Sequence, residues 1–244
     1  NKRVIKVLNN VEKVVANSEY TKNLAINNGV NKEKVKVINP GVNPAKELNK
    51  KSLEKVESLL KTKTPRLITV SRFDKRKNHE KVIMALRNLK QIYPDIVYIC
   101  IGYGDEEENL KKLVEELNLG SQVMFFKDIT DDLKNSLIAK SHIFVMPSII
   151  HKKSVEGFGI AYIEAAQYGV PSLGGKDGGA SDAIEHDRTG LICDGNNLDD
   201  IYSSLNLMIE NKKYFELGRN AKEYVAKFQW EKIIDEYKKI LTVI

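Results

Sequence analysis

The segment EGFGIAYIE, residues 156–164, places two carboxylates around a turn that contains two glycines. The glycines let a ligand approach the backbone closely, and a helix expected to begin at Ile160 offers unpaired N–H groups and the positive end of its dipole. Such a helix start favours an anion such as a phosphate. Glu164, one turn into the helix, can then accept hydrogen bonds from vicinal ribose hydroxyls, and Glu156 from hydroxyls of a sugar beyond the phosphates.

A basic loop, SRFDKRK at residues 71–77, directly follows an apolar segment with strand character. Arg72 offers a bidentate fork and Lys77 a point charge, and together they can neutralise a pyrophosphate leaving group. A solvated basic loop is the structural alternative here. For the two carboxylates the alternative is a surface Glu156 and a core-facing Glu164 paired with a cation, although the neighbouring glycines favour a ligand.

A third motif, IGYGDEEE at residues 101–108, has the beginning of a dinucleotide-binding fingerprint in Gly102 and Gly104. The third glycine of that fingerprint is replaced by Glu107, and the run of acids would repel a phosphate at the helix start. A nicotinamide-dependent oxidoreductase is therefore disfavoured. The acids instead form an ordinary helix N-terminus that complements the helix dipole.

Short apolar runs alternate with segments of helical periodicity from residue 66 onward, which is typical of a doubly wound, Rossmann-like parallel sheet with helices on both faces. Such sheets bind ligands beyond the carboxyl ends of their strands, so we expect the site in the loops that follow strands. The expected strands are 66–71, 96–101, 122–126, 142–146, 170–173 and 190–193, the expected helices include 78–93, 105–118, 131–140 and 160–168, and the loops of interest are 72–77, 102–105, 127–130 and 147–159.

The first 43 residues predict a separate βαβ unit that cannot bury both of its faces, so we expect it to be a remnant of a preceding domain. The unit has expected strands at 11–17 and 34–38 and a helix at 19–27. Residues 44–64 are rich in Lys, Glu and Ser, with Leu53, Val56 and Leu60 at helical spacing. We expect them to form a solvated helical linker.

Composition narrows the class of protein. The chain has no apolar run near the roughly 20 residues that cross a bilayer, and its first residues do not resemble a signal peptide. Cys100 and Cys193 are expected to be buried thiols in a reducing compartment. A cytoplasmic protein, with a location at the inner face of the membrane also compatible, is therefore predicted.

Charge and histidine content bear on partners and metals. The net charge of +6 favours anionic partners, including an acidic lipid surface met peripherally by the full-length protein. Because the positive residues are interleaved with acids, nucleic acid is not an expected partner. The histidines, at positions 79, 142, 151 and 186, are scattered, and no cluster has metal-ligand spacing, so no metal site and no cofactor are predicted.

The EGFGIxxxE segment resembles the E-x7-E signature of family 4 retaining glycosyltransferases, the glycosyl transferases group 1, whose GT-B fold consists of two facing Rossmann-like domains. Arg72 and Lys77 match the paired diphosphate-binding cations of that family. Further resemblances occur in the expected order along the chain: VKVINPGV at 35–42, the glycine-rich turn GGASDAI at 178–184 with TGLI at 189–192, and the aromatic start FQWE at 228–231 of a terminal helix.

The resemblance implies a role for each candidate residue. Arg72 and Lys77 would contact the diphosphate and, with Glu156, form the catalytic set, while Glu164 would contact the ribose. The remaining substrate-binding candidates are Gly157, Phe158, Gly159 and Ile160 beside the donor sugar, Asp128 and Ile129 near the base, and Gly102. Ser71, Asn78 and Lys127 replace glycines of the family pattern, and so affect the expected loop geometry and base contacts.

The implied activity is sugar transfer from a UDP- or GDP-sugar to an acceptor, with retained anomeric configuration and without a metal ion, in cell-envelope polysaccharide or glycolipid synthesis. The expected parts are an N-terminal acceptor-domain remnant (1–43), a linker (44–64), a nucleotide-sugar-binding domain (65–227) and a crossover helix (228–244). A saccharide or lipid-linked acceptor would bind the N-terminal domain, so the chain alone is expected to bind a nucleoside diphosphate without transfer. The alternative is a non-catalytic sugar-nucleotide-binding subunit of the same fold.

Overall fold

A computed structural model describes residues 2–241 and contains one large parallel sheet, ordered β5-β4-β3-β6-β7-β8. This order confirms the doubly wound sheet expected from the sequence. Its strands are β3 (Arg66–Val70), β4 (Val97–Ile101), β5 (Val123–Phe126), β6 (Ile143–Met146), β7 (Ser172–Gly175) and β8 (Gly190–Cys193). The expected strand at 170–173 begins two residues later as β7, after Pro171, which lacks the N–H that a sheet ladder needs.

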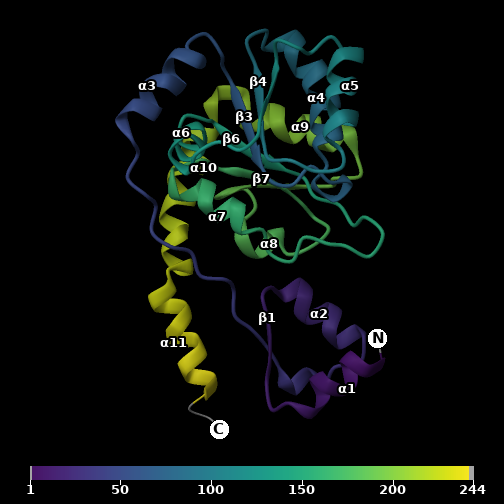
Figure 1. The fold of residues 1–244 in the computed structure, drawn as a ribbon. Coiled ribbons are helices and arrows are strands. Elements are labelled where there is room, and N and C mark those ends of the chain that lie inside the picture. Colours follow the sequence, from purple (N-terminus) through teal and green to yellow (C-terminus); the bar gives the residue numbers. More distant parts are fainter. Residues whose placement is uncertain (1, 242–244) are drawn as a thin grey trace.

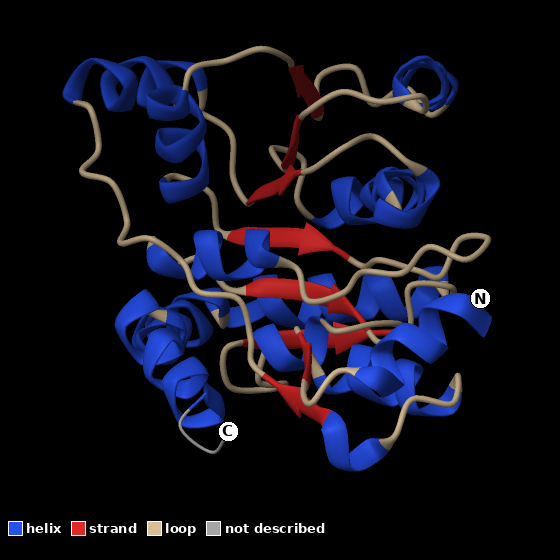
Figure 2. Cartoon of the chain, turned by 60° about the horizontal axis from the view of Figure 1, so that its bottom comes forward, coloured by secondary structure: helices blue, strands red, loops and turns tan. Residues whose placement is uncertain are grey.

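Helices cover both faces of the sheet, as Figures 1 and 2 show. One face carries α4 (His79–Ile92), α5 (Glu107–Glu116) and α9 (Leu198–Ile209), and the other carries α3 (Lys50–Leu59), α6 (Asp131–Ala139), α7 (Ile160–Gln167) and α8 (Ala180–Ala183). Each face has its own hydrophobic core: the first core lies under α4, α5 and α9, and the second lies under α3, α6, α7 and α8. Helix α10 (Tyr214–Tyr224) contributes Leu217 to the first core and Ala221 to the second. Within residues 2–241, no helix is long and apolar enough to cross a membrane.

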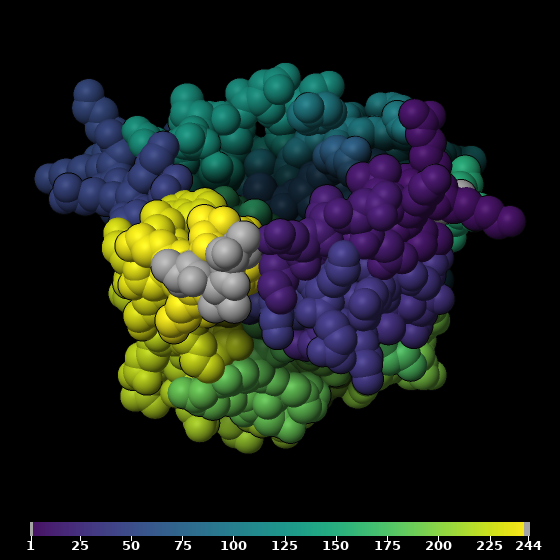
Figure 3. Space-filling model, turned by 90° about the horizontal axis from the view of Figure 1, so that it is seen from below, coloured from purple at the N-terminus to yellow at the C-terminus, as the bar shows by residue number. Residues whose placement is uncertain are grey.

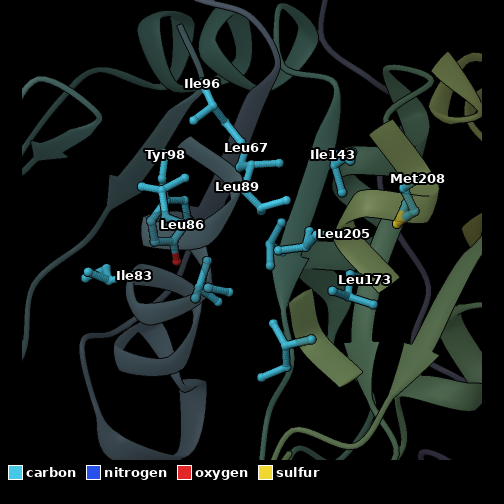
Figure 4. Close-up of a cluster of buried hydrophobic side chains, with 14 of the residues drawn as sticks. Leu67, Ile83, Leu86, Leu89, Ile96, Tyr98, Ile143, Leu173, Leu205 and Met208 are labelled. Atoms are coloured by element: carbon cyan, nitrogen blue, oxygen red, sulfur yellow. The ribbon is translucent and has the colours of Figure 1, made fainter. Parts of the chain in front are cut away.

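The sheet separates the two cores, and its pleat sends successive side chains of a strand to opposite cores. In β4, Tyr98 and Cys100 point into the first core, whereas Val97, Ile99 and Ile101 point into the second. Figure 4 shows part of the first core, where residues of β3, β4 and β6 meet side chains of α4 and α9. Because successive strand side chains alternate between faces, a strand covered on both sides has to be apolar throughout. Burial also raises the pKa of the Cys100 thiol, which is free.

Helix α3 corrects the expectation of a solvated linker. Val56 and Leu60 are completely buried in the second core, and the helix packs along α6. Most other residues of α3 are exposed, which explains why the composition of the segment predicts a linker. The helix thus belongs to the packed body of the large domain.

The N-terminal unit pairs β1 (Val14–Ala16) with β2 (Val35–Val37) in parallel across α2 (Glu19–Asn27). A helix that the sequence interpretation did not assign, α1 (Lys2–Asn10), precedes it. The core of the unit is small, with Ala16, Val30 and Val35 as its buried members.

The chain passes between the two parts beside its own C-terminal segment. Val42 N donates to Phe228 O at 2.8 Å, and a Cβ on Gly41 would lie 2.5 Å from the Trp230 ring. Helix α11 (Trp230–Leu241) then extends beyond the large domain in the same direction as the N-terminal unit, toward the bottom of Figure 1. Figure 3 shows a hollow bounded by this helix, the N-terminal unit and the large domain. Residues 242–244 of the expected crossover helix, and residue 1, lie outside the described range.

Candidate functional site

The site lies where the strand order reverses, between the central neighbours β3 and β6. Loops leave the carboxyl ends of these two strands in opposite directions, and doubly wound sheets bind ligands in the crevice formed there. The two loops are joined by Ile149 N, which donates to Arg76 O at 3.0 Å, and by the Asn78 amide, which donates to Pro147 O at 2.9 Å and to Gly195 O at 2.8 Å. The expected meeting of loops 72–77 and 147–159 is thus present.

A 3-10 turn, η2 (Lys75–Lys77), determines which basic side chains face inward. Asp74 caps it by accepting a hydrogen bond from Lys77 N at 3.1 Å. With three residues per turn, consecutive side chains point in different directions. Lys75 therefore points outward to Glu106, at 2.8 Å, whereas the side chains of Arg76 and Lys77 are only 9% and 12% exposed.

Glu156 lies between these two inward cations. Its Oε2 accepts from Arg76 Nη1 at 2.6 Å and from Lys77 Nζ, and its side chain is 14% exposed. Burial alone would raise the pKa of Glu156, but Lys77 and Arg76 together lower it below its usual range. Burial lowers the pKa of the Lys77 ammonium, and Arg76 adds to this effect. The structure therefore contains a largely buried, ionised carboxylate with two positive partners.

The start of α7 is held close to this carboxylate. Gly159, the residue before the helix, has φ +90°, and a Cβ there would lie 2.3 Å from the Tyr162 ring. No side chain caps the first turn of α7. A glycine is thus required for the chain to enter the helix, and the helix start retains the features that favour an anion.

The two residues before Gly159 have different environments. A Cβ on Gly157 would come within 3.0 Å of the Asn17 amide nitrogen, so the N-terminal unit lies directly over this backbone. Phe158 is 2% exposed and packs edge-on against Phe228 at 5.6 Å between ring centroids. Any contact of Phe158 with a ligand in this structure would therefore use its backbone rather than its ring.

Glu164 lines a cavity of about 320 Å³ between α6, α7 and the segment that joins the two parts of the chain. Ile160, 44% exposed, lines it too. Basic and acidic side chains share the wall, and Lys46 and Asp131 form an ion pair at 3.2 Å. The cavity is polar and continuous with the face of α7 that carries both Ile160 and Glu164.

The other predicted residues lie at the ends of neighbouring strands. The Arg72 side chain is 71% exposed and its ion pair is with Asp74, at 3.5 Å. A Cβ on Gly102 would lie 1.9 Å from Ser71 O, so this glycine allows the loops after β3 and β4 to touch. Asp128 has a left-handed φ of 52°, and Ile129 packs against the second core. The structure thus joins Lys77 directly to Glu156 and leaves Arg72 facing solvent.

Two residues at the site were missed by the sequence interpretation, namely Arg76 and Asn17. Arg76 lies within the basic loop at residues 71–77, and the signal that could identify it is the capping Asp74, which predicts a turn through Lys75–Lys77. Asn17 lies in the other part of the chain, and nothing local to it indicates Gly157 as its neighbour. Among the residues described, no group of three or more His, Cys, Asp or Glu side chains forms a metal site.

Comparison with known proteins gives a consistent assignment. The family model described as glycosyl transferases group 1 matches residues 50–228. A GDP-mannose-dependent alpha-(1-6)-phosphatidylinositol monomannoside mannosyltransferase of Mycobacterium tuberculosis is 28% identical over 68% of this chain and 44% of its own length. An uncharacterized glycosyltransferase of Methanocaldococcus jannaschii is 28% identical over 93% of this chain and 57% of its own length.

The fold is shared with solved structures. HepE of Anabaena in complex with UDP matches with a TM-score of 0.86 at 22% identity, over 100% of this chain and 67% of its own. Sucrose-phosphate synthase of Thermosynechococcus elongatus matches with a TM-score of 0.80 at 23% identity, over 99% of this chain and 61% of its own. The chain spans about half the length of the curated relatives it matches. Because the family model covers well over half of the chain, this protein belongs to the group 1 glycosyl transferases.

Proposed function

We propose that the crevice between β3 and β6 binds the diphosphate of a UDP- or GDP-sugar, and that the whole protein transfers the sugar with retained anomeric configuration and without a metal ion. One observation carries the proposal: Lys77 reaches the buried carboxylate of Glu156 immediately before the uncapped, glycine-entered start of α7. A cation and a helix N-terminus at one crevice are the elements that hold a diphosphate.

The same groups account for the proposed chemistry. As the bond from sugar to phosphate lengthens, negative charge grows on the departing diphosphate. Lys77 and the α7 N–H groups would stabilise that charge, and Arg72 would close over it from the exposed end of its loop. Preorganised donors of this kind are worth about 3–4 kcal/mol each in comparable sites. Glu156 would accept hydrogen bonds from donor-sugar hydroxyls.

The cavity beside Glu164 suits the nucleoside end of the donor. Glu164 lines this polar volume of about 320 Å³ and lies one turn, about 5.4 Å along the axis, beyond the start of α7. We place the base near Asp128 and Ile129, where the loop after β5 continues into α6. The names of the relatives support both donor types, because the mycobacterial protein is named as GDP-mannose-dependent and HepE was solved with UDP.

For the whole protein, we propose a saccharide or lipid-linked acceptor and a role in cell-envelope polysaccharide or glycolipid synthesis, at the cytoplasmic face of a membrane. The mycobacterial relative is named for a phosphatidylinositol mannoside acceptor, which supports the lipid-linked class. The 244-residue chain is expected to bind the nucleotide without transferring sugar.

A thermal-shift panel of UDP, GDP and ADP tests the proposal. A ligand at 100 times its Kd stabilises the folded chain by about 2.7 kcal/mol, and we expect UDP or GDP to do so. Lys77→Ala should abolish most of the shift. Lys75→Ala is the matched control, because Lys75 lies on the same turn but pairs outward with Glu106, and it should keep the shift.

Two outcomes contradict the proposal. The first is the absence of a shift with any of the three nucleotides, and the second is an equal loss of the shift in the Lys75 and Lys77 variants. Binding to the chain together with no turnover by the complete protein would instead favour a non-catalytic sugar-nucleotide-binding subunit.

A further inference from the structure

Arg76 has contacts that diphosphate binding by Lys77 does not explain. Its side chain is 9% exposed, and its guanidinium reaches Glu156 at 2.6 Å and Asp74 at 3.6 Å. It contacts the same oxygen of Glu156 that Lys77 contacts. One largely buried carboxylate oxygen therefore has two cationic partners, although one would balance its charge.

The second cation, Arg76, becomes important when Lys77 also binds the diphosphate. The Lys77 ammonium is a compact point charge with three N–H donors on a flexible stem, and its attraction to a bound diphosphate competes with its attraction to Glu156. A buried carboxylate that loses its only partner is strongly unfavourable and takes up a proton instead. The Arg76 guanidinium is fixed between Asp74 and Glu156 and stays charged at all accessible pH values.

We propose that Arg76 is a positioning residue that keeps Glu156 ionised and in place while Lys77 transfers its contact from Glu156 to the diphosphate of the donor. The inference rests on the proposed function and deepens it. Arg76 contacts the carboxylates of Glu156 and Asp74, and the effect we assign to it is on the protonation and orientation of Glu156.

Lys77 is the other group at Glu156 that exchanges a proton, because burial lowers the pKa of its ammonium, and the Glu156→Gln variants retain it and so measure its part. His79 of α4 lies near Lys77, and burial lowers its pKa to about 3. Tyr162 of α7 is completely buried, which raises its pKa well above the usual range. Neither changes its charge near neutral pH. Asp74 also contacts Arg76 in the wild type. Any proton uptake by Asp74 is measured with Glu156→Gln, which retains Arg76 and lacks the Glu156 carboxylate.

The test is titration calorimetry of the 244-residue chain with UDP and GDP, at pH 7.5 to 9 and in two buffers of different ionisation enthalpy. The difference between buffers gives the number of protons taken up per nucleotide bound. The variants are Arg76→Met, which removes the charge and keeps the length, Arg76→Gln, which keeps a hydrogen-bond donor, and Arg76→Lys, which keeps the charge. The double variant Arg76→Met/Glu156→Gln and the single variant Glu156→Gln are the controls.

We expect Arg76→Met and Arg76→Gln to take up more protons per nucleotide bound than the wild type, by at most one, and to lose affinity by up to about tenfold per pH unit as the pH rises. Arg76→Lys should keep the proton uptake and pH profile of the wild type. With Gln at position 156, replacement of Arg76 should change neither quantity. Arg76→Gln serves if Arg76→Met does not fold.

The proposal is wrong if the neutral variants bind nucleotide with the proton uptake and pH profile of the wild type. It is also wrong if Arg76→Lys behaves like the neutral variants, since charge would then not be the property that matters. A wild-type chain that binds neither UDP nor GDP would refute the proposed function itself, which separates the two failures.

Discussion

Lys77 and Glu156 are 79 residues apart in the sequence and in contact in the structure. Taken alone, each motif has a purely structural explanation. The contact between Lys77 and Glu156 places the two motifs in one site. A lysine on a solvated loop would remain exposed, whereas Lys77 is largely buried with a sulfur atom, Met146 Sδ, at 3.3 Å. Such a largely buried cation requires an anionic partner, and Glu156 supplies it.

The partly buried His142 predicts a specific acid sensitivity at the same residue scale. His142 Nδ1 accepts a hydrogen bond from Arg66 N at 2.9 Å, and burial lowers the pKa of His142 to about 4. The unfolded chain binds this proton near pH 6.5 and the folded chain does not. His142 therefore lowers the free energy of unfolding as pH drops from about 6.5 to 4, by up to about 1.4 kcal/mol per unit, and His79, with a pKa of about 3, adds a fall of its own.

His142→Gln should flatten that fall while lowering stability at neutral pH, as measured by denaturant unfolding at a series of pH values. His151→Gln, in the loop after β6, is the control and should retain the wild-type slope. Parallel curves for the wild type and His142→Gln would show that His142 does not account for the acid sensitivity.

At the scale of the element, the entry to α4 shows how one residue can replace a glycine. Asn78 has φ 63°, a left-handed conformation that asparagine tolerates better than most residues. Its amide also joins the ends of two other strands through Pro147 O and Gly195 O. The family pattern expects a glycine at this position, and the asparagine keeps the backbone conformation while adding a link across the site.

Asn78→Ala should destabilise the chain by about 2–4 kcal/mol, because it strains the left-handed backbone and removes both amide hydrogen bonds, leaving Pro147 O without its side-chain donor and Gly195 O with Lys81 Nζ alone at 3.2 Å. Asn78→Gly removes the donor only and should cost roughly 1 kcal/mol less. Chemical denaturation of the two variants measures the difference. Equal destabilisation would mean that the backbone conformation carries no cost for alanine.

At the scale of the molecule, the N-terminal unit is fastened to the large domain through Asp182. Its carboxylate accepts from Glu19 N at 2.9 Å and from the Asn39 amide at 3.3 Å. Glycines complete the contact, since a Cβ on Gly179 would lie 2.8 Å from Ser18 Oγ. The unit therefore closes over the loop that carries Glu156.

Asp182→Ala should speed amide hydrogen exchange at the start of α2, by roughly five- to tenfold, because the Glu19 N–H loses its acceptor and a bond of this kind contributes about 1 kcal/mol. Exchange mass spectrometry resolves that segment. Asp177→Ala, which removes a contact with Asn196 inside the large domain, should leave it unchanged. Unaltered exchange in the Asp182 variant would assign the closure to other contacts.

The sequence by itself determined the parallel sheet, the order of its strand–helix units and the two loops that form the site. These follow from apolar periodicity, glycines and helix caps, which act over a few residues and can therefore be recognised in the sequence. The clustering of basic residues at 71–77 and the E-x7-E spacing can be recognised in the sequence for the same reason.

Only the tertiary structure decided which cations face inward, that α3 is packed, and that Asn17 lies over Gly157. Arg72 and Arg76 have the same side chain in the same loop, yet one is exposed and the other buried against a carboxylate 80 residues away. The direction of a loop side chain depends on partners brought close by the fold, and the burial of Val56 depends on a helix that follows it by more than 70 residues. Local patterns contain no information about such partners, because burial and ion pairing are properties of surfaces that exist only after the chain has folded.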